Sequence, residues 1–244
     1  MIYDDNAALY DLQYAAYRDD IPFYTRLAHD QGGSVLELGA GTGRVTEALL
    51  AAGHEAVAVD ASAAMLARAA ARLADREGVE LVEGDMRSVR LQRRFDLVIA
   101  PFNTLMHAYT LDDQDATLAT VAEHLAPDGL FAFDVYQPRL GALGVMRREP
   151  EWADLAPNTD LFLVQEHDPE AQLVTSHYYL DQRGADGTVT RTTTTLRQRY
   201  YHRYELERAL RAAGLGRVQF YGAFDRRRWE ADSPMLLGLA RASR

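Results

Sequence analysis

Strand-like and helical patterns alternate along the chain from Ser34 to about Tyr136. The strand-like runs cover 35–38, 55–59, 79–83, 95–100 and 130–135, and stretches with helical character cover 44–52, 62–76 and 112–125. Short apolar runs bounded by turn residues are typical of strands buried in a parallel sheet. Because strands alternate with helices, the pattern predicts an α/β fold in which right-handed crossovers join parallel strands.

The pattern changes between residues 137 and 203. Three strand-like runs, at about 161–167, 172–182 and 188–201, are separated by turn residues at 168–169 and 184–187. These turns predict an antiparallel meander inserted into the α/β frame. A helix over 204–213 and two strands, at about 217–224 and 235–241, are expected to complete the chain.

The first 33 residues are expected to be partly helical and are rich in aromatic side chains. Tyr10, Tyr14 and Tyr17 are spaced to share one helix face. Two interpretations stay open, since this face could pack on the protein core or form a lid over a bound ligand. We therefore expect a helical lid over 1–33, a central domain over 34–136 and 204–244, and an inserted β subdomain over 137–203.

The amino-acid composition excludes several kinds of catalytic and metal-binding site. With 244 residues, the chain fits one α/β domain with an elaboration. It contains no cysteine, which excludes disulfides, thiolate metal sites and thiol nucleophiles. All 26 basic residues are arginines, so lysine Schiff bases, the P-loop lysine and the lysine of Tyr-x-x-x-Lys dehydrogenases are excluded as well.

The charge and the apolar runs bear on partners and location. A net charge of −10 disfavours a large phosphate-binding surface, because nucleic-acid affinity comes mainly from neutralised phosphates. No apolar run approaches the roughly 20 residues that span a bilayer. The acidic start, residues 1–5, does not show the pattern of a secretory signal. We therefore expect a cytoplasmic protein without nucleic-acid or membrane partners.

Three glycines at alternate positions follow the first predicted strand. Gly39, Gly41 and Gly43 lead directly into a helix that begins at Arg44. Glycines permit positive φ angles and let a ligand approach the main chain, so the turn predicts a nucleotide-like ligand at the carboxyl edge of the sheet. A dinucleotide fingerprint would place its third glycine at the sixth position, which is Arg44 here. A purely structural turn, or another nucleotide, stays open at this point.

The pattern E-L-G-A-G-T-G at residues 37–43 resembles motif I of the class I S-adenosylmethionine (SAM) dependent methyltransferases. Two further motifs of that family follow in order, since Asp60 lies 21 residues after Gly39 and Gly84-Asp85-Met86 follows the third predicted strand. The resemblance implies a seven-stranded Rossmann-like sheet in the order 3-2-1-4-5-7-6, with an antiparallel last strand supplied by the terminal hairpin.

The resemblance also implies roles at the cofactor site. Asp60 would accept both ribose hydroxyls, and Asp85 would take the adenine amino group. Glu37 would brace the glycine loop near the methionine end. The expected cofactor contacts are Tyr14, Glu37, Gly39, Ala40, Gly41, Asp60, Ala61, Met65, Gly84, Asp85, Met86, Pro101 and Phe102. Local alternatives remain open for Asp60 as a turn and cap residue, for Asp85 as a loop acid and for Met65 as a core residue.

The acceptor is expected beyond the fourth and fifth predicted strands, because ligands bind at the carboxyl ends of such sheets. His107 is the first candidate for a general base, since an unperturbed imidazole titrates near neutrality; a hydrogen-bonding or packing role is the alternative. The expected acceptor contacts are Asn103, Tyr109, Tyr136, Arg199 and Tyr201. Arg197, Arg199 and Tyr201 would share one face of the last meander strand and grip an anionic or sugar-like acceptor, unless that strand is simply solvated.

Together these features predict a SAM-dependent methyltransferase that moves a methyl group to nitrogen or oxygen of a small molecule and releases S-adenosylhomocysteine (SAH). The layout resembles that of aminosugar N-methyltransferases, in which case the inserted sheet would either cover the substrate or form a homodimer. The family's Asn-Pro-Pro-Tyr signature is replaced by residues 100–103, Ala-Pro-Phe-Asn, and no metal-ligand pattern occurs. The alternatives are a non-catalytic SAM-binding protein and, disfavoured by the glycine spacing, a nicotinamide-dependent oxidoreductase.

Overall fold

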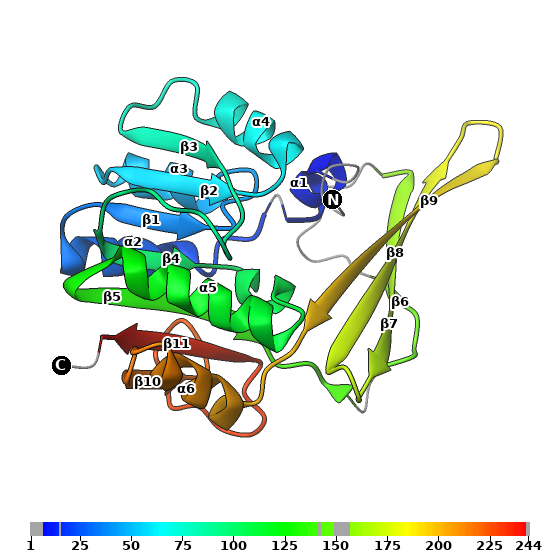
Figure 1. Cartoon of the computed structure of the whole chain (residues 1–244). Coiled ribbons are helices and arrows are strands. Elements are labelled where there is room, and N and C mark those ends of the chain that lie inside the picture. The colour runs from blue at the N-terminus through cyan, green and yellow to red at the C-terminus, as the bar shows by residue number, and fades with distance from the viewer. Residues whose placement is uncertain (1–6, 15, 141–142, 149–156, 243–244) are drawn as a thin grey trace. The chain divides into compact units, whose positions relative to one another are not determined.

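The computed structural model describes residues 7–14, 16–140, 143–148 and 157–242. The chain forms two compact units. The larger unit comprises Asp19–Gln137 and Tyr201–Arg244, and the smaller unit comprises Met1–Arg18 and Pro138–Tyr200. Figure 1 labels the helices and strands of both units.

The larger unit is built on a seven-stranded sheet in the order β10-β11-β5-β4-β1-β2-β3. Its strands are β1 (Val35–Leu38), β2 (Ala56–Asp60), β3 (Val79–Glu83), β4 (Phe95–Ala100), β5 (Leu125–Tyr136), β10 (Arg217–Tyr221) and β11 (Met235–Arg241). All neighbouring pairs are parallel except β5–β11 and β11–β10. The predicted fold class and strand order are therefore confirmed, with β11 as the one antiparallel strand.

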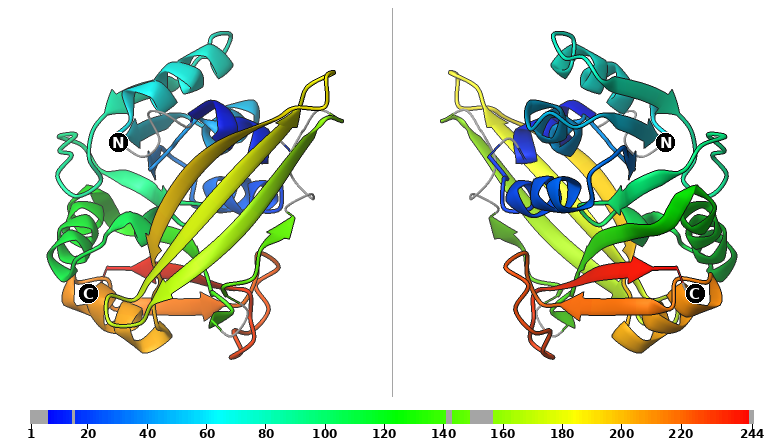
Figure 2. Two further views of the ribbon diagram at one scale, coloured as in Figure 1. Left: turned by 90° about the vertical axis from the view of Figure 1, so that its right-hand side faces the viewer. Right: turned by 90° about the vertical axis from the view of Figure 1, so that its left-hand side faces the viewer.

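Helices cover both faces of this sheet. They are α2 (Ile21–Gln31), α3 (Arg44–Ala51), α4 (Ala63–Arg72), α5 (Leu111–His124) and α6 (Arg203–Ala212), with a short 3₁₀ helix, η1 (Thr104–His107). The right-hand view of Figure 2 shows α2 and α5 on opposite sides of the strands. Ser62 caps α4, because its hydroxyl accepts a hydrogen bond from the Met65 amide.

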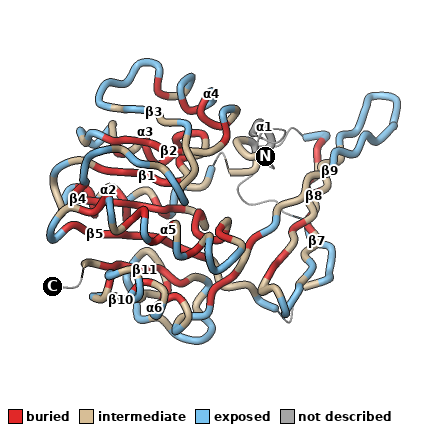
Figure 3. The backbone as a smooth tube through the Cα atoms, in the orientation of Figure 1, coloured by how far each residue is buried: buried red, intermediate tan, exposed pale blue. Residues whose placement is uncertain are grey.

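Helix α2 belongs to the core of the larger unit. Its residues Phe23, Tyr24, Leu27 and Ala28 are buried in one apolar cluster with residues of β1, β4, β5, β11 and α3. Figure 3 shows the same concentration of buried residues along the central strands. The expected lid over 1–33 is therefore too long, since residues from Asp19 onward fold with the sheet. An amphipathic helix next to a sheet buries its apolar face there because burial removes apolar area from water.

The smaller unit carries a four-stranded antiparallel sheet in the order β6-β7-β8-β9. Its strands are β6 (Arg147–Arg148), β7 (Thr159–Asp168), β8 (Leu173–Arg183) and β9 (Val189–Arg199), and its helix is α1 (Ala7–Tyr14). The predicted meander corresponds to β7, β8 and β9, whereas β6 was not expected. Within α1, the rings of Tyr10 and Tyr14 lie 5.0 Å apart, but Tyr17 lies beyond the helix end and does not share that face.

Candidate functional site

The glycine turn lies at the carboxyl end of β1. Gly39, Gly41 and Gly43 all have positive φ angles, of 67°, 57° and 79°. A Cβ atom at Gly39 would come within 2.5 Å of the Thr104 side chain, so the main chain passes close to the loop after β4. A Cβ at Gly41 would meet no atom within 4 Å, which leaves this part of the turn open to a ligand.

Asp60, the last residue of β2, ties the turn to α4. One carboxylate oxygen accepts a hydrogen bond of 2.8 Å from the Gly41 amide, and the other accepts one of 2.9 Å from the Ser62 amide. The turn-and-cap role left open by the sequence is therefore present. Each carboxylate oxygen can accept a second hydrogen bond, so the predicted contact with ribose hydroxyls remains a prediction that this geometry permits.

Glu37 lies beneath the glycine turn and is 1% exposed. Its carboxyl accepts a hydrogen bond of 2.6 Å from the hydroxyl of Thr46 in α3, which braces the strand against the helix. Burial raises the pKa of Glu37 to about 7, because the charged form loses its hydration. A cationic group bound beside this carboxyl would favour its ionised form and bring the pKa down again.

A buried ion pair that the sequence did not reveal supports the same turn. Both terminal nitrogens of Arg44, the first residue of α3, donate to the carboxylate of Asp20 at 2.6 Å. Asp20 is 0% exposed and Arg44 is 9% exposed. The Arg44 guanidinium also lies over the Phe102 ring, 5.3 Å from its centroid. An arginine at the sixth position of the glycine motif was the available sequence signal, but its partner could not be read from the sequence.

The loop after β4 is held by Asp134 near the end of β5. Phe102 and Asn103 adopt left-handed conformations, with φ angles of 53° and 67°. The Asp134 carboxylate accepts hydrogen bonds from the Phe102 amide at 2.9 Å and from the Tyr24 hydroxyl at 2.6 Å. Burial raises the pKa of Asp134 to about 6. In turn, the side-chain oxygen of Asn103, a residue expected to contact the acceptor, accepts a hydrogen bond from the Tyr136 amide at 2.7 Å and so helps to hold the loop.

His107 ends η1, and its Nδ1 lies 3.3 Å from the Tyr109 hydroxyl. Desolvation lowers the pKa of His107 to about 4, so the imidazole is neutral at physiological pH. The value near neutrality that the sequence suggested is therefore wrong for this environment. A neutral imidazole can still accept a hydrogen bond, but it is a weaker base than an exposed histidine.

Tyr201 is not on the meander strand with Arg199. Strand β9 ends at Arg199, and Tyr201 lies in the larger unit, where it is 2% exposed. Its hydroxyl donates a hydrogen bond of 2.8 Å to the carbonyl of Leu105 in η1. The expected shared face of Arg197, Arg199 and Tyr201 is corrected accordingly, because burial of the Tyr201 ring outweighs continuation of the strand.

The residues expected at the adenine end follow β2 and β3. The side chain of Met65 is 2% exposed and is covered by protein atoms, as its core interpretation requires, and its contact with adenine stays a prediction. Asp85 is engaged by Arg87, whose Nε lies 2.9 Å from it and whose Nη1 donates to Asp113 of α5 at 2.6 Å. The hydrogen bond from Arg87 lowers the pKa of Asp85. The Asp85 carboxylate is therefore part of an ion-pair network with Arg87 and Asp113, and its contact with adenine stays a prediction.

The remaining predicted residues divide between the two units. Ala40, Ala61, Gly84, Met86 and Pro101 lie in the larger unit, in the loops that follow β1, β2, β3 and β4. Tyr14 and Arg199 lie in the smaller unit, where Arg199 donates to the Gln172 side chain at 3.3 Å. The carboxyl edge of the large sheet thus brings together the glycine turn, Asp60, the Asp85 loop and the His107 loop.

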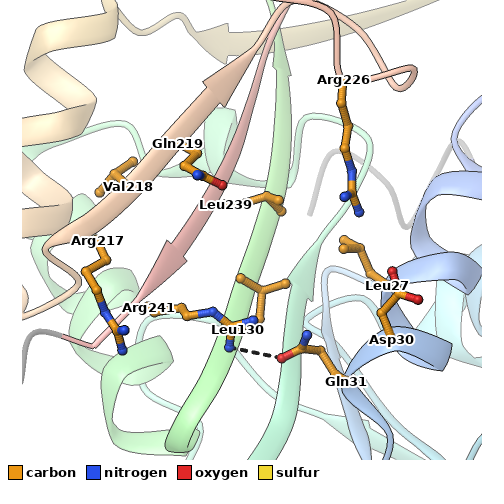
Figure 4. Close-up of a pocket in the computed structure, with 10 residues that line it drawn as sticks. All are labelled: Leu27, Asp30, Gln31, Leu130, Arg217, Val218, Gln219, Arg226, Leu239 and Arg241. Atoms are coloured by element: carbon orange, nitrogen blue, oxygen red, sulfur yellow. Dashed lines mark hydrogen bonds between the residues drawn. The ribbon is translucent and has the colours of Figure 1, made fainter.

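A groove of about 490 Å³ lies elsewhere in the larger unit, between α2 and the β10–β11 hairpin. Figure 4 shows Arg217, Arg226 and Arg241 around its apolar floor. None of the residues predicted from the sequence lines it.

Within the described ranges, no helix is long and apolar enough to cross a membrane. Among those same residues, no group of three or more His, Asp or Glu side chains could hold a metal ion.

Comparison with known proteins finds a matching domain family and proteins of similar sequence and fold. Residues 35–129 match a family described as a methyltransferase domain. The chain is 40% identical over 107 residues to the cypemycin N-terminal methyltransferase of a Streptomyces species, covering 44% of this chain and 43% of that protein. It is 29% identical over 229 residues to the dTDP-3-amino-3,6-dideoxy-alpha-D-glucopyranose N,N-dimethyltransferase of Streptomyces fradiae, covering 88% of this chain and 84% of that protein.

The solved structure of the CcbJ methyltransferase from Streptomyces caelestis is similar over 100% of this chain and 98% of that chain, with a TM-score of 0.86 and 26% identity. The chain spans about half the length of the first curated relatives that it matches. The structural similarity, in contrast, includes the inserted strands as well as the seven-stranded sheet.

Proposed function

Since fold and family match place the chain among the class I SAM-dependent methyltransferases, with the layout of the aminosugar N-methyltransferases, we propose that it methylates an amino nitrogen of a sugar or another small molecule. The observation that carries this proposal is the joint position of the open glycine turn, Asp60 and Glu37 at one edge of the sheet. SAM would supply a methyl group bound to a sulfonium, so that the acceptor's lone pair forms the new bond to the methyl carbon while the carbon–sulfur bond breaks in line and SAH leaves.

The residues at this edge fit SAM. Gly41 leaves room for a ligand against the main chain. Asp60 keeps lone pairs for the ribose hydroxyls while its oxygens hold the turn. Glu37, whose pKa burial raises to about 7, would be ionised by a neighbouring α-ammonium group, so the methionine end of SAM would neutralise a buried carboxyl. These three features support a SAM site, and their contacts with SAM are part of the proposal.

The acceptor side favours positioning over strong base catalysis. A protonated amine has no lone pair and must lose a proton before it attacks, and an imidazole whose pKa lies at about 4 removes protons poorly. The acceptor would therefore enter as the free amine, with its proton already released to water. His107 would therefore act as a neutral hydrogen-bond acceptor that orients the amine, with Tyr109 beside it. Most of the rate would come from alignment and exclusion of water, as in-line transfer from an activated carbon allows.

The names of the relatives support nitrogen as the receiving atom. The cypemycin enzyme is named for an N-terminal amine and the Streptomyces fradiae enzyme for an amino sugar. We extend only their shared feature, an amine acceptor, to this chain. Contacts of the acceptor with Asn103, Tyr136, Arg199 and Tyr201, contacts of SAM with Tyr14, a homodimer through the inserted sheet and a cytoplasmic location all remain proposals of the same kind.

A thermal-shift series tests the cofactor directly. SAM and SAH at about 100 times their dissociation constants should stabilise the protein by roughly 2.7 kcal/mol. For a chain of this size, that raises the melting temperature by about 5–10 °C. NAD and NADP serve as the matched nucleotide controls and should leave the melting temperature unchanged. Stabilisation by a nicotinamide nucleotide without stabilisation by either sulfur ligand would reject the proposal.

Turnover separates an enzyme from a non-catalytic SAM-binding protein. SAH release should be followed with a panel of primary and secondary amines, including amino sugars, against their hydroxyl analogues. We expect SAH formation that depends on an amine acceptor. Binding of SAM without turnover for any acceptor would favour the non-catalytic alternative.

A further inference from the structure

A cluster of aromatic rings surrounds the guanidinium of Arg203, the first residue of α6. The guanidinium carbon lies 5.3 Å from the ring centroid of Tyr204, 5.5 Å from that of Trp229 and 5.8 Å from that of Phe220. Contacts of this kind attract a cation to the faces of the rings. The Arg203 side chain is therefore fixed in position by three rings.

This guanidinium lacks a carboxylate. Among the described residues, Arg203 forms no ion pair, and its Nε is buried without a hydrogen-bond partner. The indole nitrogen of Trp229, in the same cluster, is also buried without a partner. Buried donors are usually paired in folded proteins, so the described residues leave the donors of this cluster unsatisfied.

The cluster lies at the edge of the sheet where the acceptor is expected. Phe220 pairs with Gly238 across β10 and β11, and Gly238 pairs with Phe133 in β5. Because neighbouring strands are about 4.8 Å apart, the Phe220 backbone is roughly 10 Å from the residue that precedes Asp134. On the helix side, Arg203 follows two residues after Tyr201, whose hydroxyl is bonded to Leu105 in the loop that carries His107.

We propose that Arg203, in its cage of Tyr204, Phe220 and Trp229, binds an oxyanion carried by the methyl acceptor, either a phosphate or a carboxylate. The site rests on the proposed methyl transfer, because it requires an acceptor that carries an acidic group in addition to its amine. Arginine suits this task because its planar donors match phosphate and carboxylate oxygens in pairs. Only Nε is fully covered, and Arg203 as a whole is partly exposed, so its terminal nitrogens are open to a ligand.

The aromatic rings would let the site select a ligand by its flat or apolar part as well as by its charge. They hold the guanidinium plane and leave Tyr204, which is 70% exposed, as a flat surface beside it. A ligand with an oxyanion next to an apolar or flat body would contact both parts. A free surface arginine would select only for charge, and a core arginine would be closed to ligands.

Fluorescence of Trp229 gives a direct test. The chain has two tryptophans, and Trp152 lies outside the described residues, so Trp152→Phe leaves Trp229 as the single reporter. Titration with inorganic phosphate, acetate and thymidine diphosphate, each against sodium chloride at equal ionic strength, should give a saturable change for at least one of the three. Phosphate and acetate tell the two oxyanions apart, and the diphosphate tests whether an attached flat body tightens binding.

Two variants in the Trp152→Phe background decide the assignment. Arg203→Gln should weaken binding by at least about tenfold, since charge-assisted hydrogen bonds of this kind carry that much. Arg208→Gln removes the same charge from an exposed position on the same helix and should leave binding unchanged. Arg203→Lys keeps the charge but not the paired donors, and it should also bind the ligand less tightly than the parent does. This variant replaces Arg203→Gln in the test if Arg203→Gln fails to fold.

The outcomes separate this site from the proposed function. A saturable change that Arg203→Gln or Arg203→Lys weakens and Arg208→Gln preserves supports the site. No saturable change with any of the three ligands, or a change of equal size in the Arg203 variants, overturns it. Calorimetry with SAM on the same proteins tests the proposed function independently, because SAM binding by the Arg203 variants should equal that of the parent.

Discussion

Tyr24 and Asp134 are joined by a buried hydrogen bond of 2.6 Å although 110 positions separate them in the sequence. The same Asp134 oxygen accepts the Phe102 amide, so a side chain of α2 helps to fix the loop after β4. Asp20, which lies four residues before Tyr24 and directly precedes α2, forms an ion pair with Arg44 under the glycine turn. The start of α2 therefore supports both the predicted cofactor turn and the predicted acceptor loop.

Tyr24→Phe removes the hydroxyl but keeps the ring in the core. The Asp134 carboxylate then loses a donor in a buried environment, and we expect a loss of about 1–3 kcal/mol in the free energy of unfolding. Urea denaturation measures it. Tyr221→Phe is the matched control, because the Tyr221 hydroxyl bonds the exposed Gln219 side chain and its removal should cost little. Equal losses in both variants would contradict a special role for Tyr24.

The Asp20–Arg44 pair should respond asymmetrically to substitution. Arg44→Gln leaves Asp20 charged and buried, and we expect it to cost about 3–5 kcal/mol of stability. The double variant Asp20→Asn/Arg44→Gln should recover part of that loss, since no uncompensated charge remains. Arg211→Gln breaks an exposed pair with Glu207 and should change stability by less than about 1 kcal/mol. Without recovery in the double variant, the charge of Asp20 would not be the cause.

The raised pKa of Glu37 predicts how stability depends on pH. The folded-state pKa of about 7 exceeds the ordinary glutamate pKa of 4.5, so below pH 4.5 burial of this carboxyl does not reduce the free energy of unfolding. As the pH rises from about 4.5 to 7, the unfolded chain releases the proton first, and folding loses up to roughly 3 kcal/mol. Above pH 7 the loss is constant.

Glu37→Gln should flatten this dependence. We expect the difference in unfolding free energy between the variant and the parent to shift in favour of the variant between pH 5 and pH 7.5. Chemical denaturation at several pH values measures that difference. Glu77→Gln, at an exposed position, is the control and should keep the dependence of the parent. A parallel pair of curves for Glu37→Gln and the parent would mean that Glu37 titrates normally.

Asp60 combines a structural and a proposed ligand role, and two variants separate them. Asp60→Ala should abolish measurable SAM binding by calorimetry and also destabilise the fold, because the Gly41 and Ser62 amides lose their acceptor. Asp60→Asn keeps one side-chain oxygen that can accept a main-chain amide. It should therefore lose little of the free energy of unfolding but much of the affinity for SAM. Asp75→Ala, on the exposed surface after α4, controls for loss of a charge. SAM affinity unchanged in Asp60→Ala would show that β2 does not end at the cofactor.

His107→Ala tests the proposed orienting role. Once an amine acceptor is found, we expect turnover to fall by about 10²-fold or more while SAM affinity stays within a factor of about two. The turnover of the parent should show no ionisation of His107 between pH 6 and 9, because its pKa lies at about 4. His54→Ala, outside the site, is the control. A group that titrates near pH 6.5 and disappears in His107→Ala would show that substrate restores an ordinary pKa.

The sequence by itself determined the frame of this protein. The alternation of apolar runs with helical stretches, and the turn residues between them, specify strand and helix positions because these signals are local. The spacing of Gly39, Gly41, Gly43 and Asp60 likewise depended on a short segment and predicted the cofactor edge. The strand order was implied by the resemblance to the class I methyltransferases, and the order of β1–β5 with β10 and β11 confirms it.

Tertiary structure decided what burial and distant partners control. The sequence contained Asp20, Tyr24 and Arg87 but not their contacts with Arg44, Asp134 and Asp113, because those pairs form only when separate elements pack. It also could not give the lowered pKa of His107 or the raised pKa of Glu37, since both follow from loss of hydration in the folded chain. Tyr201 is not part of the meander strand, because its ring is buried within the larger unit. Local patterns thus fixed where the elements lie, and desolvation decided what their side chains can do.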